Sequence, residues 1–323
     1  MPYLECRNLK YNYPTFHLDM SFSVEKGEFV CVIGPSGSGK STLLSLIAGI
    51  KDPNSGHIIL NGRDITALEI RKRRIGMVFQ DFSLFPSMDV AHNIQYGMKD
   101  MTGKEKEAET TRLLELAGLS GYGKRQVHEL SGGEAQRVAL VRAIAAKPDV
   151  LLLDEPLSAL DAPLRRHLRT VIRQIHENTG ITMLYVTHDR EEAFAIADRI
   201  MVMRRGNIEA LGRPEDIYRH PASLFVANFT GDGSAIPVSR ISGEDSDNVL
   251  FFRPEDIVLD TVQNPEEYIC LEGARVESCE FNGAGYMVKL SYQGYGITAY
   301  STRKPQEENM SVFIPRAAAI ELK

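Results

Sequence analysis

The stretch Gly34-Pro35-Ser36-Gly37-Ser38-Gly39-Lys40-Ser41-Thr42 decides how this chain folds, because it matches GxxxxGK[ST] at every fixed position. It directly follows the apolar run 29–33 and directly precedes the helical run 43–47. In that setting the glycines let backbone N–H groups turn inward around phosphate oxygens, and the following helix directs its positive end at the same charge. Lys40 is expected to reach the β- and γ-phosphates of a nucleotide, and the Ser41 hydroxyl is expected to ligate Mg²⁺. A glycine-rich turn that binds nothing is disfavoured by this strand, loop and helix context.

A second apolar strand, 150–153, delivers two acidic residues at its C-terminal end. Such ends are where α/β sheets bind ligands. Asp154 is expected to hold Mg²⁺, directly or through water. Glu155 stands one residue on, where it would polarise an attacking water, a form of catalysis worth roughly 10²–10⁴-fold. The competing interpretation of Glu155 is a mere charge at a helix start.

Up to about residue 230, short β-branched runs alternate with longer amphipathic patterns, which is typical of α/β domains with a largely parallel sheet. The expected strands are 28–33, 75–79, 150–153, 182–186 and 199–203, and the expected helices are 40–49, 105–117, 134–146, 161–178 and 189–197. Residues 18–24 and 57–60 predict a smaller antiparallel layer that flanks the nucleotide. After the flexible junction 231–234, short alternating runs predict a second, mostly β domain.

Composition excludes several classes of protein. The chain has 323 residues, 43% of them hydrophobic, and a formal net charge of -6, which suits two domains and argues against nucleic acid as a partner. The basic run 71–74 is interpreted as a solvated face or a local partner contact. Four scattered cysteines indicate neither a disulfide framework nor a metal site, and they fit a reducing cytosol. Since no segment approaches ~20 continuous apolar residues, the chain is expected neither to cross a membrane nor to be exported.

The run Leu130-Ser131-Gly132-Gly133-Glu134, continued by Gln136-Arg137, predicts a second anion-binding helix start. Ser131 is a hydroxyl N-cap, and the two glycines expose backbone N–H groups. With this motif in place, residues 1–230 resemble the ATPase subunits of ABC transporters; a P-loop GTPase or kinase leaves 130–137 without explanation. The resemblance implies that residues 131–134 contact the γ-phosphate of an ATP held by another subunit. It therefore implies a head-to-tail, two-fold dimer, formed with an identical chain or with a paralogous ATPase subunit.

Further positions gain a role from the resemblance. Gln80 resembles the glutamine that contacts Mg²⁺ and the attacking water, and His188 resembles the switch histidine that contacts the γ-phosphate. Asp161, in Ser158-Ala159-Leu160-Asp161, resembles an aspartate that bridges the two subunits, and it would also serve as an N-cap. In the family an aromatic ring stacks on adenine; Tyr13 is the preferred candidate and Tyr11 the alternative.

The expected site residues form three overlapping sets. The catalytic set is Lys40, Gln80, Glu155 and His188. The metal set is Ser41, Gln80 and Asp154. The ATP-binding set is Tyr13, Gly34, Ser36, Gly37, Ser38, Gly39, Lys40, Ser41, Thr42, Gln80, Ser131, Gly132, Gly133, Glu134, Asp161 and His188.

The resemblance also implies a domain plan: an ATPase domain over 1–230, with a helical subdomain at about 86–147, and a TOBE-type, OB-like regulatory domain over 231–323. Exporters commonly fuse the ATPase to the membrane domain, so the chain is expected to be the ATPase subunit of an importer, on the inner face of the cell membrane. Its partners would be separate permease subunits and, indirectly, an external solute-binding protein. The permease would dock near Phe82 and Phe85, unless these residues simply pack inside the helical subdomain.

The sequence limits the range of candidate solutes but does not identify the one transported. The C-terminal segment is shorter than the two-lobed version in sugar importers, which favours an inorganic ion, such as ferric iron, molybdate or sulfate, or a polyamine. The alternative function is a soluble ABC ATPase of DNA repair or translation. The sequence has neither the long insertion of the repair proteins nor the second cassette of the translation factors.

Overall fold

The computed structural model describes residues 2–13, 16–158, 160–241, 243, 245–259 and 262–323. Its contacts divide the chain into two compact units, Met1–Pro214 and Glu215–Lys323. Each unit has a hydrophobic core of its own. Within the described ranges, no helix is both long and apolar enough to span a membrane.

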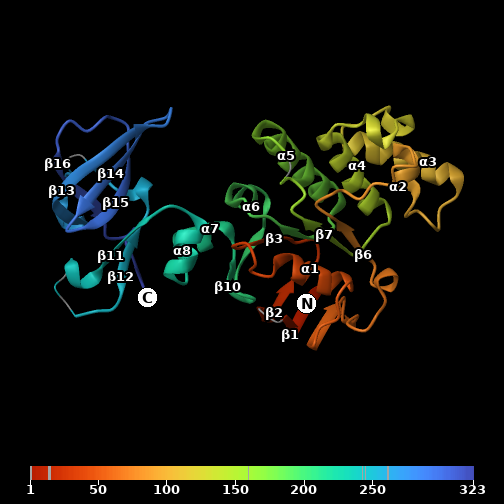
Figure 1. The fold of residues 1–323 in the computed structure, drawn as a ribbon, viewed down its shortest axis with the longest axis horizontal. Helices are drawn as coiled ribbons and strands as arrows, with labels where there is room; N and C mark the ends of the chain where they lie inside the picture. The colour runs from red at the N-terminus through yellow and green to blue at the C-terminus, as the bar shows by residue number, and fades with distance from the viewer. Residues whose placement is uncertain (1, 14–15, 159, 242, 244, 260–261) are drawn as a thin grey trace. The chain divides into compact units, whose positions relative to one another are not determined.

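The first unit is built on a six-stranded sheet in the order β10-β9-β3-β8-β7-β6 (Figure 1). Its strands are β3 (Phe29–Ile33), β6 (Ile75–Val78), β7 (Val150–Asp154), β8 (Thr182–Val186), β9 (Arg199–Arg204) and β10 (Asn207–Gly212). The first five pair in parallel, and β10 joins β9 as an antiparallel hairpin. Every residue of β3 and β8 is buried, as expected for strands covered on both faces. The predicted α/β fold is confirmed.

Helices cover both faces of this sheet: α1 (Lys40–Ala48) on one, and α5 (Ala162–Thr179) and α6 (Arg190–Ile196) on the other. Successive side chains of a strand point to opposite faces. Val30 and Val32 of β3 therefore share one core cluster with Leu43 of α1. Phe29 faces the other side, where its ring centroid lies 5.1 Å from that of His176 in α5. This packing fixes the loop between β3 and α1.

A four-stranded antiparallel sheet, in the order β2-β1-β4-β5, joins the core of α1. Its strands are β1 (Leu4–Tyr13), β2 (Phe16–Val24), β4 (Ser55–Leu60) and β5 (Arg63–Asp64). The expected segments 18–24 and 57–60 are parts of β2 and β4. Sequence analysis did not predict β1, which pairs with both.

Three helices lie between β6 and β7 in the chain: α2 (Val90–Gln95), α3 (Gly103–Leu116) and α4 (Gly132–Ala145). Short 3₁₀ turns occupy Ile70–Lys72, Tyr122–Lys124 and Val127–Glu129. Capping boxes start the two long helices, formed by Thr102 with Glu105 and by Ser131 with Glu134. Both starts are therefore set by local sequence.

The second unit begins at Glu215 within α7 (Pro214–Arg219), followed by α8 (Leu224–Thr230). It continues as two antiparallel sheets, β11-β12-β17 and β15-β14-β13-β16. The strands are β11 (Ser234–Pro237), β12 (Val249–Phe252), β13 (Tyr268–Phe281), β14 (Tyr286–Tyr292), β15 (Tyr295–Ser301), β16 (Asn309–Pro315) and β17 (Ile320–Leu322). Short 3₁₀ turns lie at Val238–Arg240, Pro254–Asp256 and Pro265–Glu267. This part of the chain is mostly β, as expected.

Arg253 explains why the contacts divide the chain at 214 rather than at 230. Its buried guanidinium donates to the carbonyl oxygens of Tyr218 at 3.0 Å and of Ala227 at 2.9 Å, and to the Thr230 hydroxyl at 3.2 Å. It thereby ties α7 and α8 to the β-rich part. The role of 231–323 as a regulatory domain stays a prediction.

Candidate functional site

A cavity of ≈ 910 Å³ lies at the C-terminal end of β3. Its lining from the phosphate loop is Ser36, Gly37, Gly39, Lys40, Ser41 and Thr42. The rest of the lining is Tyr13, Phe16, His17, Asp19, Lys51, Glu155, Arg205 and Asn207. A cavity of this size accommodates a nucleotide.

The phosphate loop already has the shape of an anion cradle. Gly37 and Gly39 have positive φ angles of 77° and 102°, which glycine adopts freely. The Ser38 hydroxyl is buried and has no hydrogen-bond partner among the described residues. Lys40 donates to the carbonyl oxygens of Gly34 at 2.8 Å and Pro35 at 3.0 Å. Burial lowers the pKa of Lys40, while the charges of Glu155 and Asp154 raise it.

The turn between β9 and β10 braces this loop from far along the chain. The Gly206 N–H donates to the Ser38 carbonyl oxygen at 3.0 Å, and the Asp19 N–H donates to the Gly206 carbonyl oxygen at 3.1 Å. Gly206 has φ 82°, and a Cβ there would lie 1.8 Å from the His17 carbonyl oxygen. Only glycine fits this position, so the brace depends on it.

The metal-ligand candidates Ser41 and Asp154 come together as expected. The Ser41 hydroxyl donates to Asp154 Oδ1 at 3.0 Å, although the two residues belong to different elements. Burial raises the pKa of Asp154; the hydroxyl of Ser41 and the charge of Lys40 act against this, and the charge of Glu155 adds to it. A hydroxyl and a carboxylate oxygen are the ligand types that Mg²⁺ takes, so the pair fits such an ion.

Glu155 and His188 form the second pair in the site. Glu155 has a positive φ of 45°, and its N–H donates to the Val186 carbonyl oxygen at 3.0 Å. This places the Glu155 carboxylate 3.3 Å from Nδ1 of His188, which follows β8. Glu155 also lines the cavity. A carboxylate beside the phosphate loop, oriented by an imidazole, has the arrangement that a general base requires.

Gln80 approaches this pair indirectly. It is exposed, and its amide donates to the Ser158 hydroxyl at 3.2 Å. That hydroxyl in turn donates to the Glu155 carbonyl oxygen at 2.9 Å. In this structure the Gln80 amide therefore bonds a side chain of the Glu155 loop, the Ser158 hydroxyl, and reaches the backbone of that loop only through it. Ala159 of the expected bridging segment lies outside the described residues.

The capped helix start at Ser131 forms as predicted but apart from the cavity, and its binding of an anion stays a prediction. The Ser131 hydroxyl accepts from the Glu134 N–H at 3.4 Å, and Glu134 accepts from the Ser131 N–H at 2.8 Å. Asp161 caps α5, accepting from the Leu164 N–H at 3.0 Å. Among the described residues that line the cavity, none comes from 131–134 or 161. Within one chain, the helix start at 131–134 therefore lies apart from the phosphate loop, which starts α1.

Glu134 is expected to stabilise this helix start in a pH-dependent way. The Tyr122 hydroxyl and the Ser131 N–H lower its pKa to about 2. A lowered pKa contributes stability above the ordinary value near 4.5, and this contribution is lost as the pH falls towards 2. We expect Glu134→Gln to lower the melting temperature at pH 6, with the difference from wild type shrinking below pH 4.5. The exposed Glu115→Gln is the control, and an equal difference at every pH would contradict the assignment.

Tyr13 is the better placed of the two tyrosines. It is 50% exposed and lines the cavity, whereas Tyr11 packs against the core of the first unit. The Lys51 ammonium lies 4.9 Å from the Tyr13 ring centroid and 5.3 Å from that of Tyr11. The Tyr13 ring is thus held at the cavity wall, where a base would stack.

Tyr13→Ala is expected to raise the dissociation constant for ATP about tenfold, since stacking of a base on an aromatic ring is worth about 1–3 kcal/mol. Tyr13→Phe keeps the ring and should bind ATP like the wild type. Titration with a fluorescent ATP analogue measures both. If Tyr11→Ala weakened binding and Tyr13→Ala did not, Tyr11 would be the stacking residue.

The segment after Gln80 is anchored to the helical region. Arg142 donates to the carbonyl oxygens of Phe82 at 3.1 Å and Ser83 at 2.7 Å. The Phe85 ring centroid lies 4.5 Å from that of Tyr96. Both phenylalanines are half-buried, so packing accounts for part of each ring and leaves part accessible.

Sequence analysis missed the cavity residues Phe16, His17, Asp19, Lys51, Arg205 and Asn207. The two-residue turn Arg205-Gly206 is typical of a hairpin, but the sequence of the strands beside it does not reveal that the turn meets the phosphate loop.

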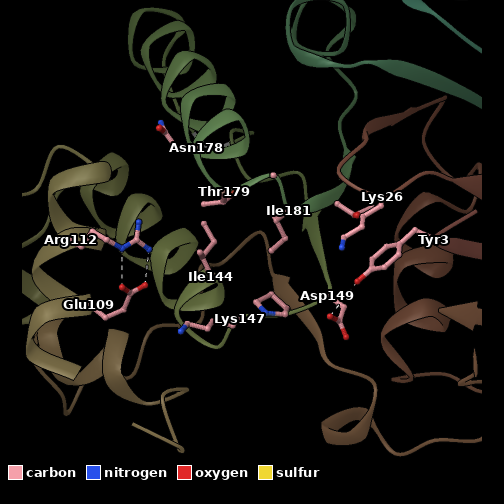
Figure 2. A pocket seen from close by; sticks show the side chains of 13 residues that line it. Tyr3, Lys26, Glu109, Arg112, Ile144, Lys147, Asp149, Asn178, Thr179 and Ile181 are labelled. Carbon is pink, nitrogen blue, oxygen red and sulfur yellow. Dashed lines mark hydrogen bonds and ion pairs between the residues drawn. The ribbon is translucent and has the colours of Figure 1, made fainter. Parts of the chain in front are cut away.

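A second cavity, of ≈ 390 Å³, lies by the N-terminal ends of β7 and β8 (Figure 2). The Tyr3 hydroxyl donates a hydrogen bond to Asp149 Oδ1 there at 3.3 Å. Among its described lining residues, none was assigned from the sequence.

Comparison with known proteins supports the same assignment. Residues 18–158 match the family model described as ABC transporter. The chain is 46% identical to the sulfate/thiosulfate import ATP-binding protein CysA 2 of Chromobacterium violaceum, covering 91% of this chain and 85% of that protein. It is 47% identical to the Fe(3+) ions import ATP-binding protein FbpC of Brucella abortus, covering 72% of this chain and 66% of that protein.

Solved structures agree with the sequence relatives. cbiO1 from Clostridium perfringens, part of the ABC transporter complex cbiONQ, superposes with a TM-score of 0.62 and 28% identity, covering 67% of this chain and 90% of that one. The ATP-binding cassette MJ0796, in a dimer bound to ADP and Pi, gives a TM-score of 0.57 and 29% identity, covering 65% and 98%. The fold class and the resemblance drawn from residues 1–230 are confirmed. The chain belongs to the ABC transporter family, as an ATP-binding subunit that hydrolyses ATP.

Proposed function

We propose that this chain drives an importer for an inorganic ion, hydrolysing Mg-ATP in a dimer on the cytoplasmic side of separate permease subunits. The Glu155–His188 pair beside the phosphate loop is the observation that carries the hydrolytic part. The import part rests on the relatives named for sulfate/thiosulfate and Fe(3+) import. An external solute-binding protein would deliver the ion to the permease.

Within one chain, the phosphate loop binds the triphosphate. Lys40 exchanges the carbonyl oxygens of Gly34 and Pro35 for the β- and γ-phosphate oxygens. Ser41 and Asp154 would hold Mg²⁺, with Gln80 approaching from its loop. When bound, the ion neutralises charge on the phosphate oxygens. Tyr13 supports the base.

Glu155 is the proposed general base. Its carboxylate accepts a proton from the attacking water, and His188 holds that carboxylate and approaches the γ-phosphate. Charge grows on the transferred phosphoryl oxygens, so Lys40 and the backbone N–H groups of the loop stabilise the transition state electrostatically. No covalent intermediate with the protein is required.

A second subunit would complete each site. The helix start at 131–134 exposes N–H groups suited to a phosphate, yet it lies outside the cavity of its own chain. A head-to-tail pair of chains brings one helix start to each γ-phosphate, and Asp161 then lies near the interface. ATP binding closes the pair and hydrolysis reopens it. The dimeric structure of the related cassette MJ0796 supports pairing of two chains.

Reconstitution tests this function. The chain would be purified with the permease that it retains from membranes and placed in proteoliposomes with the matching solute-binding protein. We expect sulfate, thiosulfate or Fe³⁺ to stimulate ATP hydrolysis and to accumulate in the lumen, with spermidine as the contrasting solute. Stimulation by spermidine alone would reject the inorganic ion. Retention of no permease, with turnover instead stimulated by DNA or ribosomes, would reject transport.

A further inference from the structure

Arg165, in the first turn of α5, makes contacts that none of the expected motifs includes. Its Nη2 donates to the Leu160 carbonyl oxygen at 3.0 Å. Its Nη1 donates to Asp189 Oδ2 at 3.1 Å. Its Nε lies 3.7 Å from Glu192 Oε1 and is buried without a hydrogen bond among the described residues. One guanidinium thus reaches two loops and one helix.

Glu192, which lies beside Arg165, is itself held in place by buried hydrogen bonds. Only 3% of Glu192 is exposed, and its carboxylate accepts from the Tyr185 hydroxyl at 2.9 Å and the Thr187 hydroxyl at 2.7 Å. The Thr187 hydroxyl oxygen also accepts from the Asp189 N–H at 3.0 Å. Both chain neighbours of His188 are therefore held: Thr187 by Glu192, and Asp189 by Arg165.

The other end of the contact lies in the loop that carries Glu155. Ser158 binds the Glu155 carbonyl oxygen, and Leu160 precedes the capping residue Asp161. Arg165 holds the carbonyl oxygen of Leu160 and the carboxylate of Asp189 at the same time. The 3.3 Å contact between Glu155 and His188 joins the same two loops.

We propose that Arg165 is a positioning residue that sets the spacing between the Glu155 loop and the His188 loop. The proposal rests on the proposed roles of Glu155 and His188. A guanidinium suits the task because its donors spread in one rigid plane and reach one acceptor in each loop, Leu160 O and Asp189 Oδ2. A lysine ammonium, in contrast, is a single charged point on a flexible stem. A shift of about 1 Å in such a pair costs up to about 10²-fold in rate.

The kinetic test compares two neighbouring arginines. Arg165→Lys keeps the charge and loses the fork, and we expect kcat to fall at least about tenfold with KM for ATP unchanged. Arg166→Ala is the matched control, since Arg166 is exposed and its side chain has no hydrogen bond or ion pair in the described part of the chain. Asp189→Asn keeps the cap of α6 and removes the ion pair, so it should reproduce the effect even if Arg165→Lys folds poorly. Equal kcat in Arg165→Lys and Arg166→Ala would overturn the proposal.

Hydrogen exchange of the full chain without nucleotide tests the same idea independently of catalysis. In Arg165→Lys, peptides covering 157–162 and 187–190 should take up deuterium faster together, while β8 and the rest of α6 stay protected. Faster uptake through β8 and α6 as well would indicate a general structural role and overturn the proposal.

A double variant separates this proposal from the proposed function. If His188→Ala alone turned over ATP normally, the role of His188 would fail, while the exchange result would still test the link between the loops. If His188→Ala is impaired, adding Arg165→Lys should cause no further loss in the residual rate. A full multiplicative loss would show that Arg165 acts elsewhere.

Discussion

Replacing Glu155 by glutamine is expected to lower the rate of ATP hydrolysis about 10²–10⁴-fold while ATP remains bound. The amide has the shape of the carboxylate and tolerates the same backbone, but it accepts no proton from water. Since hydrolysis would remove the phosphate that joins two chains, this variant should also accumulate as an ATP-bound dimer. Single-turnover hydrolysis and size-exclusion chromatography with Mg-ATP measure the two effects.

The matched control is Glu191→Gln, a change of the same size at an exposed position of α6. It should hydrolyse ATP like the wild type. Normal turnover by Glu155→Gln would remove Glu155 from the role of base. A variant that lost ATP binding as well would assign Glu155 to the nucleotide cradle instead.

Mixing two inactive variants is expected to restore hydrolysis. Lys40→Ala removes the phosphate lysine, and Gly132→Asp puts a carboxylate where the second helix start would meet the γ-phosphate. Gly132 has room for this change, because a Cβ there would lie 3.7 Å from the Leu160 side chain, which is ordinary van der Waals contact. A mixed dimer has one site with both parts intact, so random pairing should give about one quarter of the wild-type rate.

The control for this experiment is Gly103→Asp. Gly103 is the first residue of α3 and directly follows the N-cap residue of a capping box, as Gly132 does in α4. A Cβ at Gly103 would meet open space. Gly103→Asp should be active alone. A mixture that stayed inactive, although both variants folded, would mean that each chain completes its own site.

The local parts of the site were predictable because each lies within one strand and the loop after it. The phosphate loop and the pair Asp154-Glu155 both follow apolar strands, so their positions at one edge of the sheet follow from the parallel order. The contacts of Ser41 with Asp154 and of Glu155 with His188 agree with that order. Their catalytic roles stay predictions.

Contacts set by tertiary packing were not predictable. The run 71–74 was interpreted as solvated or as a partner contact, which is wrong for Arg73. This side chain is 2% exposed and donates to the carbonyl oxygens of Thr66, Leu68, Leu46 and Ile47. It therefore caps the C-terminal end of α1 from a distant segment. A run of charged residues in a sequence does not show which of its side chains becomes buried.

The hydrogen bond from Gly206 to Ser38 bears on how the protein folds while it is synthesised on the ribosome. β3 lies between β8 and β9, and Ser38 is held by the turn after β9, so every neighbour of the phosphate loop in the sheet is synthesised much later than the loop. A nascent chain that stops in the helical region carries the whole GxxxxGK[ST] sequence without a cradle for it. We therefore expect the nascent chain to bind ATP only after the hairpin of β9 and β10 has emerged.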